Sequence, residues 1–379
     1  MPTYDFGSGR TDPATFPTAA MAEAAARAIV EVGEGFVLYP GDLGHAGLRQ
    51  VMAARESTRE GVQVSPEHIA LMNGSMQAVT LVAEALMEKP GDIILMEELS
   101  YSGTIGAYKS LGAELVGVAI DEHGMRLDAL EERLRELRDK GTPPAFIYTL
   151  PTYQNPTGSV MPRQRRLQLI EVARRYDAIV VEDNCYGDVH FEGSKEPALY
   201  ALDDDPNMVY ICSLSKILGP GVRLGYLLAR PPMLQRILAR RYDGGNSLLA
   251  ASIAAELFRE RLWDHLAHTN SVLKEKRDAI FAALQESVGD ICTWSRPVGG
   301  LFIWVGFPDD VDQERLYQLV AEKDIALARG SAFHIHGEHI PYLRLAFGYS
   351  SMEMIREGIP LLGECIHQAR VGAQVAAGG

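Results

Sequence analysis

The chain has 379 residues, of which 47% are hydrophobic and 23% are charged, and its formal net charge is −14. This length allows two lobes, or one large domain with a smaller one, and the acidic balance argues against nucleic acid and anionic membranes as partners. Four cysteines without a CxxC spacing argue against a disulfide framework or a structural zinc site, and they suit a reducing compartment.

The N-terminal segment is expected to join the smaller domain, because residues 1–45 contain no strand that could find a partner within the segment. The opening residues, MPTYDFGSGRTDP, lack the positively charged start and the apolar core of a signal peptide. No apolar run is long enough to span a membrane. We therefore expect a cytoplasmic protein that does not bind membranes.

From about residue 65 to about residue 230, short apolar runs alternate with helical stretches. The runs are DIILME, AELVGVAI, AFIYTLPTY, DAIVVEDNCY, NMVYICSLSK and RLGYLLAR. Leucines at helical spacing mark LDALEERLRELR as one helix, and Pro162 suits the first turn of another. This alternation predicts an α/β fold, with a mostly parallel sheet covered by helices on both faces.

A second α/β region follows a long helical region that is expected to run to about residue 288. Strands are predicted at GGLFIWVGF, DIALARGSAF and YLRLAF, and helices at DQERLYQLVAEK and the C-terminus. We therefore divide the chain into a large domain at residues 46–285 and a small domain at residues 286–379, which residues 1–45 join.

Four polar residues lie where the predicted strands of the large domain end: Asn155, Asp183, Tyr186 and Lys216. In sheets of this kind the ligand crevice lies beyond the carboxyl ends of the strands. One pocket could therefore collect all four side chains.

Lys216 and Asp183 suggest a specific chemistry. A lysine at a strand end is partly desolvated, which lowers its pKa and favours the free amine that forms a Schiff base with a carbonyl. The alternative is a solvated lysine without a role. A buried Asp183 needs a cationic partner, and a protonated pyridine nitrogen would make the ring an electron sink. Alternatively, Asp183 caps the next helix.

Two further motifs suit phenolate and phosphate groups. In PTYQNPTG the amide of Asn155 can donate to a phenolate oxygen, although Asn-Pro and Thr-Gly are also turn signals. In NGSMQAV a glycine and Ser75 open a helix whose backbone N–H groups could cradle a phosphate, although many helices begin this way. Arg223 could complete that cradle with the hydroxyls of Ser213 and Ser215.

Five motifs together resemble a known family. SLSKILGPGVRLGY, TYQNPTG, EDNCYGD, NGSMQAV and YLRLAF occur in the order and spacing of the class I/II aminotransferases, which are pyridoxal-phosphate enzymes of fold type I. The resemblance spans essentially the whole chain and is nearest to the aminoadipate and kynurenine aminotransferases and the MocR-like regulators. It implies the fold type I architecture, pyridoxal 5′-phosphate as cofactor, and a homodimer with active sites at the subunit interface.

The same resemblance implies roles for individual residues around the cofactor. Lys216 would form the Schiff base and then act as general base and acid, and Asp183 would keep the pyridine nitrogen protonated. Tyr186 and Asn155 would hydrogen-bond the ring oxygen O3′, and Tyr101 would stack on the ring face. The residues expected to hold the phosphate are Ser75, Met76, Ser213, Ser215 and Arg223.

Substrate contacts are implied in the same way. Arg344 would bind the α-carboxylate with its guanidinium fork, and Gly9 and Asn155 would lie beside the substrate. Tyr39 would reach the phosphate in the neighbouring subunit.

The chain departs from the family pattern at two positions. Met76 stands where glutamine is common, so only its backbone N–H is expected to bind. No second basic residue precedes Arg223, so the phosphate site has one charge fewer.

Two other features have more than one interpretation. HIHGEH, at residues 334–339, looks like a metal motif, but we expect a substrate-gating loop and no metal, because no complete ligand set is evident. Arg10 could meet an acidic substrate side chain or could simply lie at the surface.

The predicted function is transfer of an amino group from an L-amino acid to a 2-oxo acid by a ping-pong mechanism. A lyase or an oxidase on the same scaffold would keep all of these residues and remains an alternative. A non-catalytic, MocR-like cofactor sensor is a second alternative. The sequence does not identify the substrate side chain.

Overall fold

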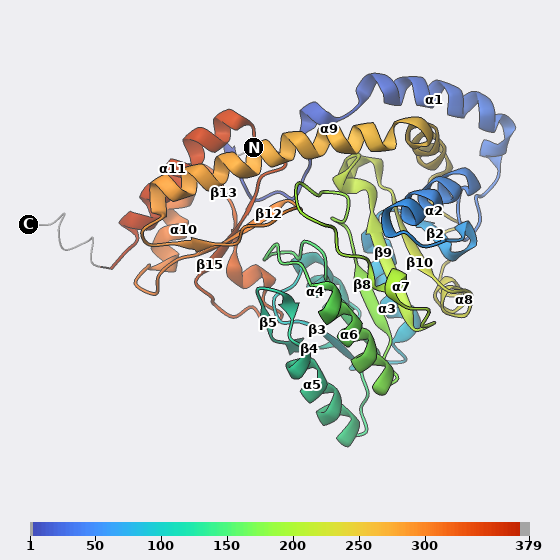
Figure 1. Cartoon of the computed structure of the whole chain (residues 1–379), viewed down its shortest axis with the longest axis horizontal. Helices are drawn as coiled ribbons and strands as arrows, with labels where there is room; N and C mark the ends of the chain where they lie inside the picture. Colours follow the sequence, from blue (N-terminus) through green and yellow to red (C-terminus); the bar gives the residue numbers. More distant parts are fainter. Residues whose placement is uncertain (1–2, 372–379) are drawn as a thin grey trace, which may run out of the picture.

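A seven-stranded sheet forms the centre of the larger lobe in the computed structural model, which describes residues 3–371 (Figure 1). The strand order is β2-β10-β9-β8-β7-β3-β4, and all neighbours are parallel except that β10 is antiparallel to both β2 and β9. The strands are β2 Ile69–Met72, β3 Ile93–Glu97, β4 Glu114–Val118, β7 Phe146–Thr149, β8 Val180–Asp183, β9 Met208–Ser213 and β10 Gly225–Ala229. The predicted α/β class with a mostly parallel sheet is confirmed.

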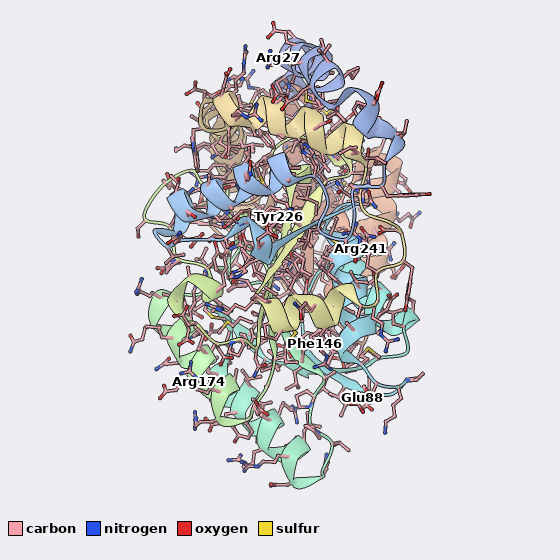
Figure 2. All side chains as sticks on the ribbon, turned by 90° about the vertical axis from the view of Figure 1, so that its right-hand side faces the viewer. Arg27, Glu88, Phe146, Arg174, Tyr226 and Arg241 are labelled. Atoms are coloured by element: carbon pink, nitrogen blue, oxygen red, sulfur yellow. The ribbon has the colours of Figure 1, made fainter. Side chains whose placement is uncertain are left out.

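Helices cover both faces of this sheet, because alternate strand residues point to opposite sides. One face packs against α3 Ser75–Leu86, α4 Ser102–Ser110 and α8 Pro231–Leu238. The other face packs against α5 Leu127–Asp139 and α6 Arg163–Arg175, and nearer β2 against α1 Thr18–Val32, α2 Ala46–Glu60 and α9 Leu248–Val288. Figure 2 shows Tyr226 and Phe146 in the interior and the charged side chains of Arg27, Arg174 and Glu88 at the periphery. Among residues 3–371, no helix combines the length and the apolar character that crossing a bilayer requires.

The structure corrects two local predictions and refines a third. Strand β9 ends at Ser213, so Lys216 does not end the strand but is the last residue of a 3-10 turn, Leu214–Lys216. Pro162 is the residue that precedes α6, with extended ψ, and does not lie within its first turn. The predicted long helical region is present as two helices, α8 and α9, and Gly244 and Gly245 between them have positive φ values, which a helix does not allow.

The smaller lobe is built on an antiparallel sheet in the order β11-β12-β15-β14, comprising β11 Thr293–Trp294, β12 Phe302–Gly306, β15 Tyr342–Ala346 and β14 Ala328–Arg329. Its core includes residues of α10 Gln313–Glu322 and α11 Met352–Gln368. Strand β1 Tyr4–Asp5 pairs in parallel with β13 Ile325–Ala326, whereas α1 packs along α9. The minor elements are β5 Ile120–Asp121, β6 Gly124–Met125 and α7 Leu199–Leu202. The division at residues 45/46 and 285/286 stays a prediction, and its second boundary falls in the last turn of α9.

A buried ionic cluster ties α2 to the loop that follows β8. The side chains of Arg55, Glu56, Arg59 and Asp188 are all almost fully buried. Arg55 pairs with Asp188, and Arg59 Nη2 lies 2.6 Å from Glu56 Oε2. Burial by itself would raise the pKa of Asp188, but the two arginines lower it below its ordinary value. The cluster therefore fixes the loop that also carries Tyr186.

Replacement of Asp188 by alanine is expected to destabilise the protein by about 3 kcal/mol, because two buried guanidinium groups lose one of the two carboxylates that they share and keep only Glu56 in common. Urea denaturation of the apoprotein measures the change in the free energy of unfolding. The matched control is Glu136→Ala, which breaks the exposed pair Arg133–Glu136 and is expected to cost less than about 1 kcal/mol. Equal losses of unfolding free energy in the two variants would show that the buried cluster stabilises the protein no more than an exposed ion pair does.

Candidate active site

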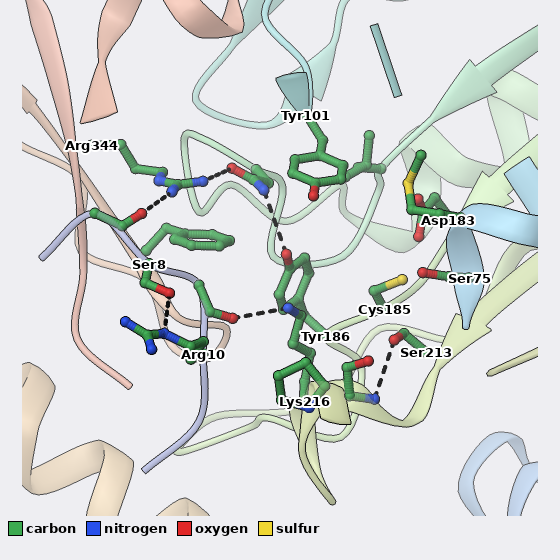
Figure 3. A pocket seen from close by; sticks show the side chains of 18 of the residues that line it. Ser8, Arg10, Ser75, Tyr101, Asp183, Cys185, Tyr186, Ser213, Lys216 and Arg344 are labelled. Atoms are coloured by element: carbon green, nitrogen blue, oxygen red, sulfur yellow. Dashed lines mark hydrogen bonds between the residues drawn. The ribbon is translucent and has the colours of Figure 1, made fainter. Parts of the chain in front are cut away.

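A cavity of about 370 Å³ lies beyond the carboxyl ends of β7, β8 and β9, where the N-terminal segment and the smaller lobe close over the sheet (Figure 3). In Figure 3, Arg344 lies on one side of this cavity and Asp183, Ser75 and Ser213 lie on the other. The predicted site residues that line it are Gly9, Ser75, Met76, Tyr101, Asn155, Asp183, Tyr186, Ser213, Ser215, Lys216, Arg223 and Arg344. The structure thus brings together residues that lie as much as 335 positions apart in the chain, Gly9 and Arg344.

Lys216 presents its amine to the middle of the cavity. The turn that carries it is tightened by Ser213 Oγ, which accepts a hydrogen bond from the backbone N–H of Ser215 at 3.2 Å. Lys216 Nζ donates to the backbone carbonyl of Gly9 at 2.9 Å. Burial lowers the pKa of Lys216, and nearby Arg344 lowers it further, against the opposing effect of Cys185 and Asp183. The free amine is therefore favoured more than in an exposed lysine.

Asp183 is the last residue of β8 and is buried. Its Oδ2 accepts a hydrogen bond from Tyr148 Oη at 2.6 Å. Its Oδ1 is buried and has no hydrogen-bond partner of good geometry among the described residues. Burial raises the pKa of Asp183, and hydrogen bonds from Cys185 and Tyr148 only partly oppose the rise. A carboxylate in this state needs a donor or a cation from within the cavity.

Arg344 lies on β15, and both terminal nitrogens of its guanidinium group are hydrogen-bonded. Its Nη1 donates to Asn155 Oδ1 and its Nη2 to the carbonyl of Gly7, both at 2.8 Å, while its buried Nε has no partner among the described residues. The guanidinium lies 4.1 Å from the ring centroid of Phe302 and 4.6 Å from that of Phe333. Burial lowers the pKa of Arg344 to about 10, so it remains a cation at neutral pH. Such a desolvated fork suits a carboxylate.

The opposite end of the cavity is the N-terminus of α3. Gly74 precedes this helix with φ +87°, which favours glycine, and a Cβ there would lie 2.6 Å from Arg223 Nη2 and displace that side chain. Arg223 donates to the carbonyl of Asn73 at 3.0 Å. The first backbone N–H groups of α3, at Ser75 and Met76, have no acceptor within the helix. This end of the cavity therefore suits an anion.

Tyrosine rings line the space between the two ends. Tyr101 is the residue before α4, and Gly103 makes room for it, since a Cβ at position 103 would lie 2.6 Å from Tyr101 Cε1. Tyr186 is buried, and its hydroxyl accepts a hydrogen bond from Asn155 Nδ2 at 3.4 Å. Burial raises the pKa of both phenols, so they stay neutral donors at working pH.

The sequence as a whole matches one family. The family model described as aminotransferase class I and II matches residues 3–359. The chain belongs to the class I and II aminotransferase family.

Individual relatives of this aminotransferase chain agree with the assignment. It is 33% identical over 363 residues to aromatic-amino-acid aminotransferase 1 of Thermococcus litoralis, covering 95% of this chain and 87% of the relative. The structure of the α-aminoadipate aminotransferase of Thermus thermophilus, complexed with N-(5′-phosphopyridoxyl)-L-leucine, has a TM-score of 0.88 at 32% identity, covering 98% and 93% of the two chains. At 29% identity, a helix-turn-helix regulator of Bacillus subtilis also matches 94% of this chain and 72% of its own length.

One predicted residue of this aminotransferase lies away from the cavity. Tyr39 is 86% exposed, and its ring rests against Gly244, where a Cβ would lie 2.8 Å from Tyr39 Cδ1. Its expected contact is with a neighbouring subunit, so its role stays a prediction.

Arg10 lines the cavity but already has partners. Its guanidinium pairs with Asp5 and bonds to Ser8 Oγ, and it lies 3.9 Å from the ring centroid of Tyr349. In Figure 3 this group points away from the cavity centre. Its charge is therefore already compensated within the N-terminal segment.

The histidine loop at residues 334–339 is tied to the larger lobe. Residue Ile335 donates its N–H to the carbonyl of Glu98 at 3.0 Å, and His334 forms an isolated bridge with Leu99. Among residues 3–371, no group of three or more histidine, cysteine or carboxylate side chains could hold a metal ion. Gating by this loop stays a prediction.

Sequence reasoning missed several contributors to the site. Cys185 and Phe302 line the cavity, and Tyr148 contacts Asp183 from behind. Phe302 lies within the predicted strand GGLFIWVGF, where strand alternation places it on the same face as Trp304. Tyr148 carried no signal beyond being a tyrosine within an otherwise apolar run.

Proposed function

We propose that this chain transfers an amino group from an L-amino acid to a 2-oxo acid with pyridoxal 5′-phosphate as cofactor. The observation that carries the proposal is that the amine of Lys216 and the unpartnered Oδ1 of Asp183 line one cavity. An anion-binding helix start and the fork of Arg344 lie at its two ends. These four features match an aldehyde, a ring nitrogen, a phosphate and a substrate carboxylate.

The residues present fit this cofactor. Asp183 Oδ1 lacks the donor that a protonated pyridine nitrogen would provide, and the amide of Asn155 and the hydroxyl of Tyr186 would meet the ring oxygen. When bound, pyridoxal phosphate supplies an aldehyde that condenses with amines and a ring that accepts electrons from the α-carbon. The groups that would hold the phosphate are the N–H groups of Ser75 and Met76, the hydroxyls of Ser213 and Ser215, and Arg223.

The side chains of this chain would do the remaining work. Lys216 would hold the cofactor covalently until the substrate amine displaces it. Its Nζ, whose pKa is lowered by burial, would then take the proton from the substrate α-carbon and later return it. Tyr101 and Phe302 would exclude water from the reacting atoms.

Replacement of Arg344 by lysine is expected to raise the KM for the amino acid and for the 2-oxo acid by about 10–100-fold, because an ammonium keeps the charge but loses the two-pronged contact. Steady-state kinetics with both substrates measure the change. A primary amine without a carboxylate is the control, and its slow reaction is expected to be unaffected. Unchanged KM values for carboxylate substrates would rule out this role for Arg344.

The substrate side chain is best sought with a panel of amino donors. The two aminotransferase relatives above are named for aromatic amino acids and for 2-aminoadipate, so these two classes come first. Cofactor absorbance during single turnovers ranks the donors without requiring knowledge of the 2-oxo acid.

The reaction type is tested by adding an amino acid without any 2-oxo acid. A transaminase converts its bound cofactor to pyridoxamine phosphate and stops after one turnover, whereas a lyase or an oxidase releases ammonia continuously. A protein that binds the cofactor but converts no amino acid in either way would favour the sensor alternative.

A homodimer with active sites at the subunit interface is part of the proposal. Val37, Leu38, Tyr39 and Tyr242 are 68–87% exposed, and such apolar exposure is typical of an interaction surface. Size-exclusion chromatography with light scattering tests the dimer, and a monomer that retains full activity would contradict it.

We also propose a cytoplasmic location. All four cysteines are free, which is usual in a reducing compartment.

A further inference from the structure

A buried chain of hydroxyl groups reaches Asp183 from the side opposite the cavity. Tyr148 on β7 is fully buried, and its Oη donates to Asp183 Oδ2 at 2.6 Å. Thr104 on α4, also fully buried, lies with its Oγ1 3.1 Å from the same Oη. Because the single phenolic proton is used on the carboxylate, Thr104 has to be the donor to Tyr148. The hydroxyl groups therefore donate hydrogen bonds in one direction, from Thr104 to Tyr148 and from Tyr148 to Asp183.

This direction matters for the charge on Asp183. Burial, and then the neighbouring Asp183 carboxylate, raise the pKa of Tyr148 well above its ordinary value, so the phenol keeps its proton and acts only as a donor. A donor to Oδ2 stabilises the ionised carboxylate against the burial that disfavours it. Donation from Thr104 polarises the phenol and strengthens its bond to the carboxylate.

The same contact sets the orientation of the carboxylate. With Oδ2 engaged by Tyr148, the other oxygen, Oδ1, is a buried atom without a partner of good geometry among the described residues, in a residue that lines the cavity. Rotation of the carboxylate would break a short, charge-assisted hydrogen bond between two buried side chains. The rings of Tyr108 and Tyr148 meet edge to face at 5.6 Å, which keeps the phenol in place.

We infer that Tyr148 is a positioning residue that keeps the Asp183 carboxylate ionised and turns its free oxygen toward the cofactor's ring nitrogen. This inference rests on the proposed function, because it concerns the group that would bind there. Nothing in the spacing of the motifs points to Tyr148.

The test compares Tyr148→Phe with Tyr108→Phe. Both variants remove one hydroxyl from a fully buried ring, but the hydroxyl of Tyr108 has no hydrogen-bond partner among the described residues. Tyr148→Phe is expected to weaken binding of pyridoxal phosphate to the apoprotein by about 10–100-fold, measured by equilibrium dialysis, because a hydrogen bond to a buried charge is lost. It is also expected to lower kcat by at least about tenfold while the KM for the amino acid stays within about twofold. Tyr108→Phe should match the wild type in all three measurements.

A third variant, Thr104→Val, covers the case in which Tyr148→Phe fails to fold. It leaves the phenol in place and is expected to change cofactor affinity and kcat in the same direction by a smaller factor, about 2–5-fold. If Tyr148→Phe is folded and equals Tyr108→Phe, or if Thr104→Val equals the wild type where the first variant cannot be obtained, the inference is overturned. A wild-type apoprotein that binds no pyridoxal phosphate would instead overturn the proposed function.

Discussion

Replacement of Lys216 by alanine is expected to lower the transamination rate by at least about 10³-fold, the largest effect of any single change in this chain. The variant loses both the covalent attachment point and the base for the α-proton, and positioned acid–base catalysis alone contributes about 10²–10⁴-fold. No other amine can replace it, because the cavity has no second lysine among its described lining residues. Single-turnover absorbance of the bound cofactor measures the loss.

Chemical labelling gives a second, independent readout for Lys216. Borohydride treatment of the cofactor-loaded wild type is expected to fix the cofactor to the peptide that contains Lys216, as seen by mass spectrometry, and to leave Lys216→Ala unlabelled. Lys89→Ala is the control, since Lys89 is exposed on a loop, and it should label and react like the wild type. Label on a different lysine of the wild type would show that Lys216 is not the residue that binds the cofactor covalently.

Replacement of Asp183 by asparagine is expected to have the second-largest effect, a fall in kcat of about 10²–10³-fold. The amide has nearly the same shape and can still accept a hydrogen bond from Tyr148, but it carries no charge to hold a proton on a ring nitrogen. Electrostatic stabilisation inside a dry site is worth this much when one preorganised group is removed. Rapid-quench measurement of the half-reaction reports the loss without interference from product release.

The control for this change is Asp177→Asn. Asp177 is exposed, and its φ of +51° lies in the left-handed region that asparagine tolerates, so neither folding nor activity should change. A cofactor analogue with a methylated, permanently charged ring nitrogen is expected to restore part of the activity of Asp183→Asn. No recovery with that analogue, together with near-normal kcat for pyridoxal phosphate itself, would place Asp183 outside the chemistry.

Much of the fold could be predicted because buried parallel strands and their covering helices leave strong patterns. The apolar runs around β3, β7, β8 and β9 correspond to the strands of the structure. The reversed direction of β10 could not be predicted, because a strand buried on both faces shows the same apolar run whichever way it points. The end of β9 was also missed, since the hydrogen bond from the N–H of Ser215 to Ser213 Oγ that closes the turn is a local detail.

Some features of the candidate site could likewise be predicted from the sequence, and others could not. Lys216 and Asp183 could be predicted because a lysine or a carboxylate next to a buried strand is unusual. The contact between Arg344 and Asn155 joins residues 189 positions apart, and only the packing of the smaller lobe against the sheet brings them together. Tyr148 was missed because a tyrosine in an apolar strand is common, and its meaning depends on which atom its hydroxyl reaches.

The 41-residue helix α9 has a mechanical consequence. Its first half contributes Ala251, Leu257 and Leu262 to the core beside the large sheet, and its second half contributes Leu273, Ile280 and Leu284 to the core of the smaller lobe. The helix is continuous, with a total rise of about 60 Å, and it is embedded at both ends, so any further change in its curvature would break hydrogen bonds or open a core. A movement of the lobe that carries Arg344 must therefore occur around α9 or tilt this helix. A tilt of α9 would also move α1, which packs along α9 at the end away from the smaller lobe (Figure 1).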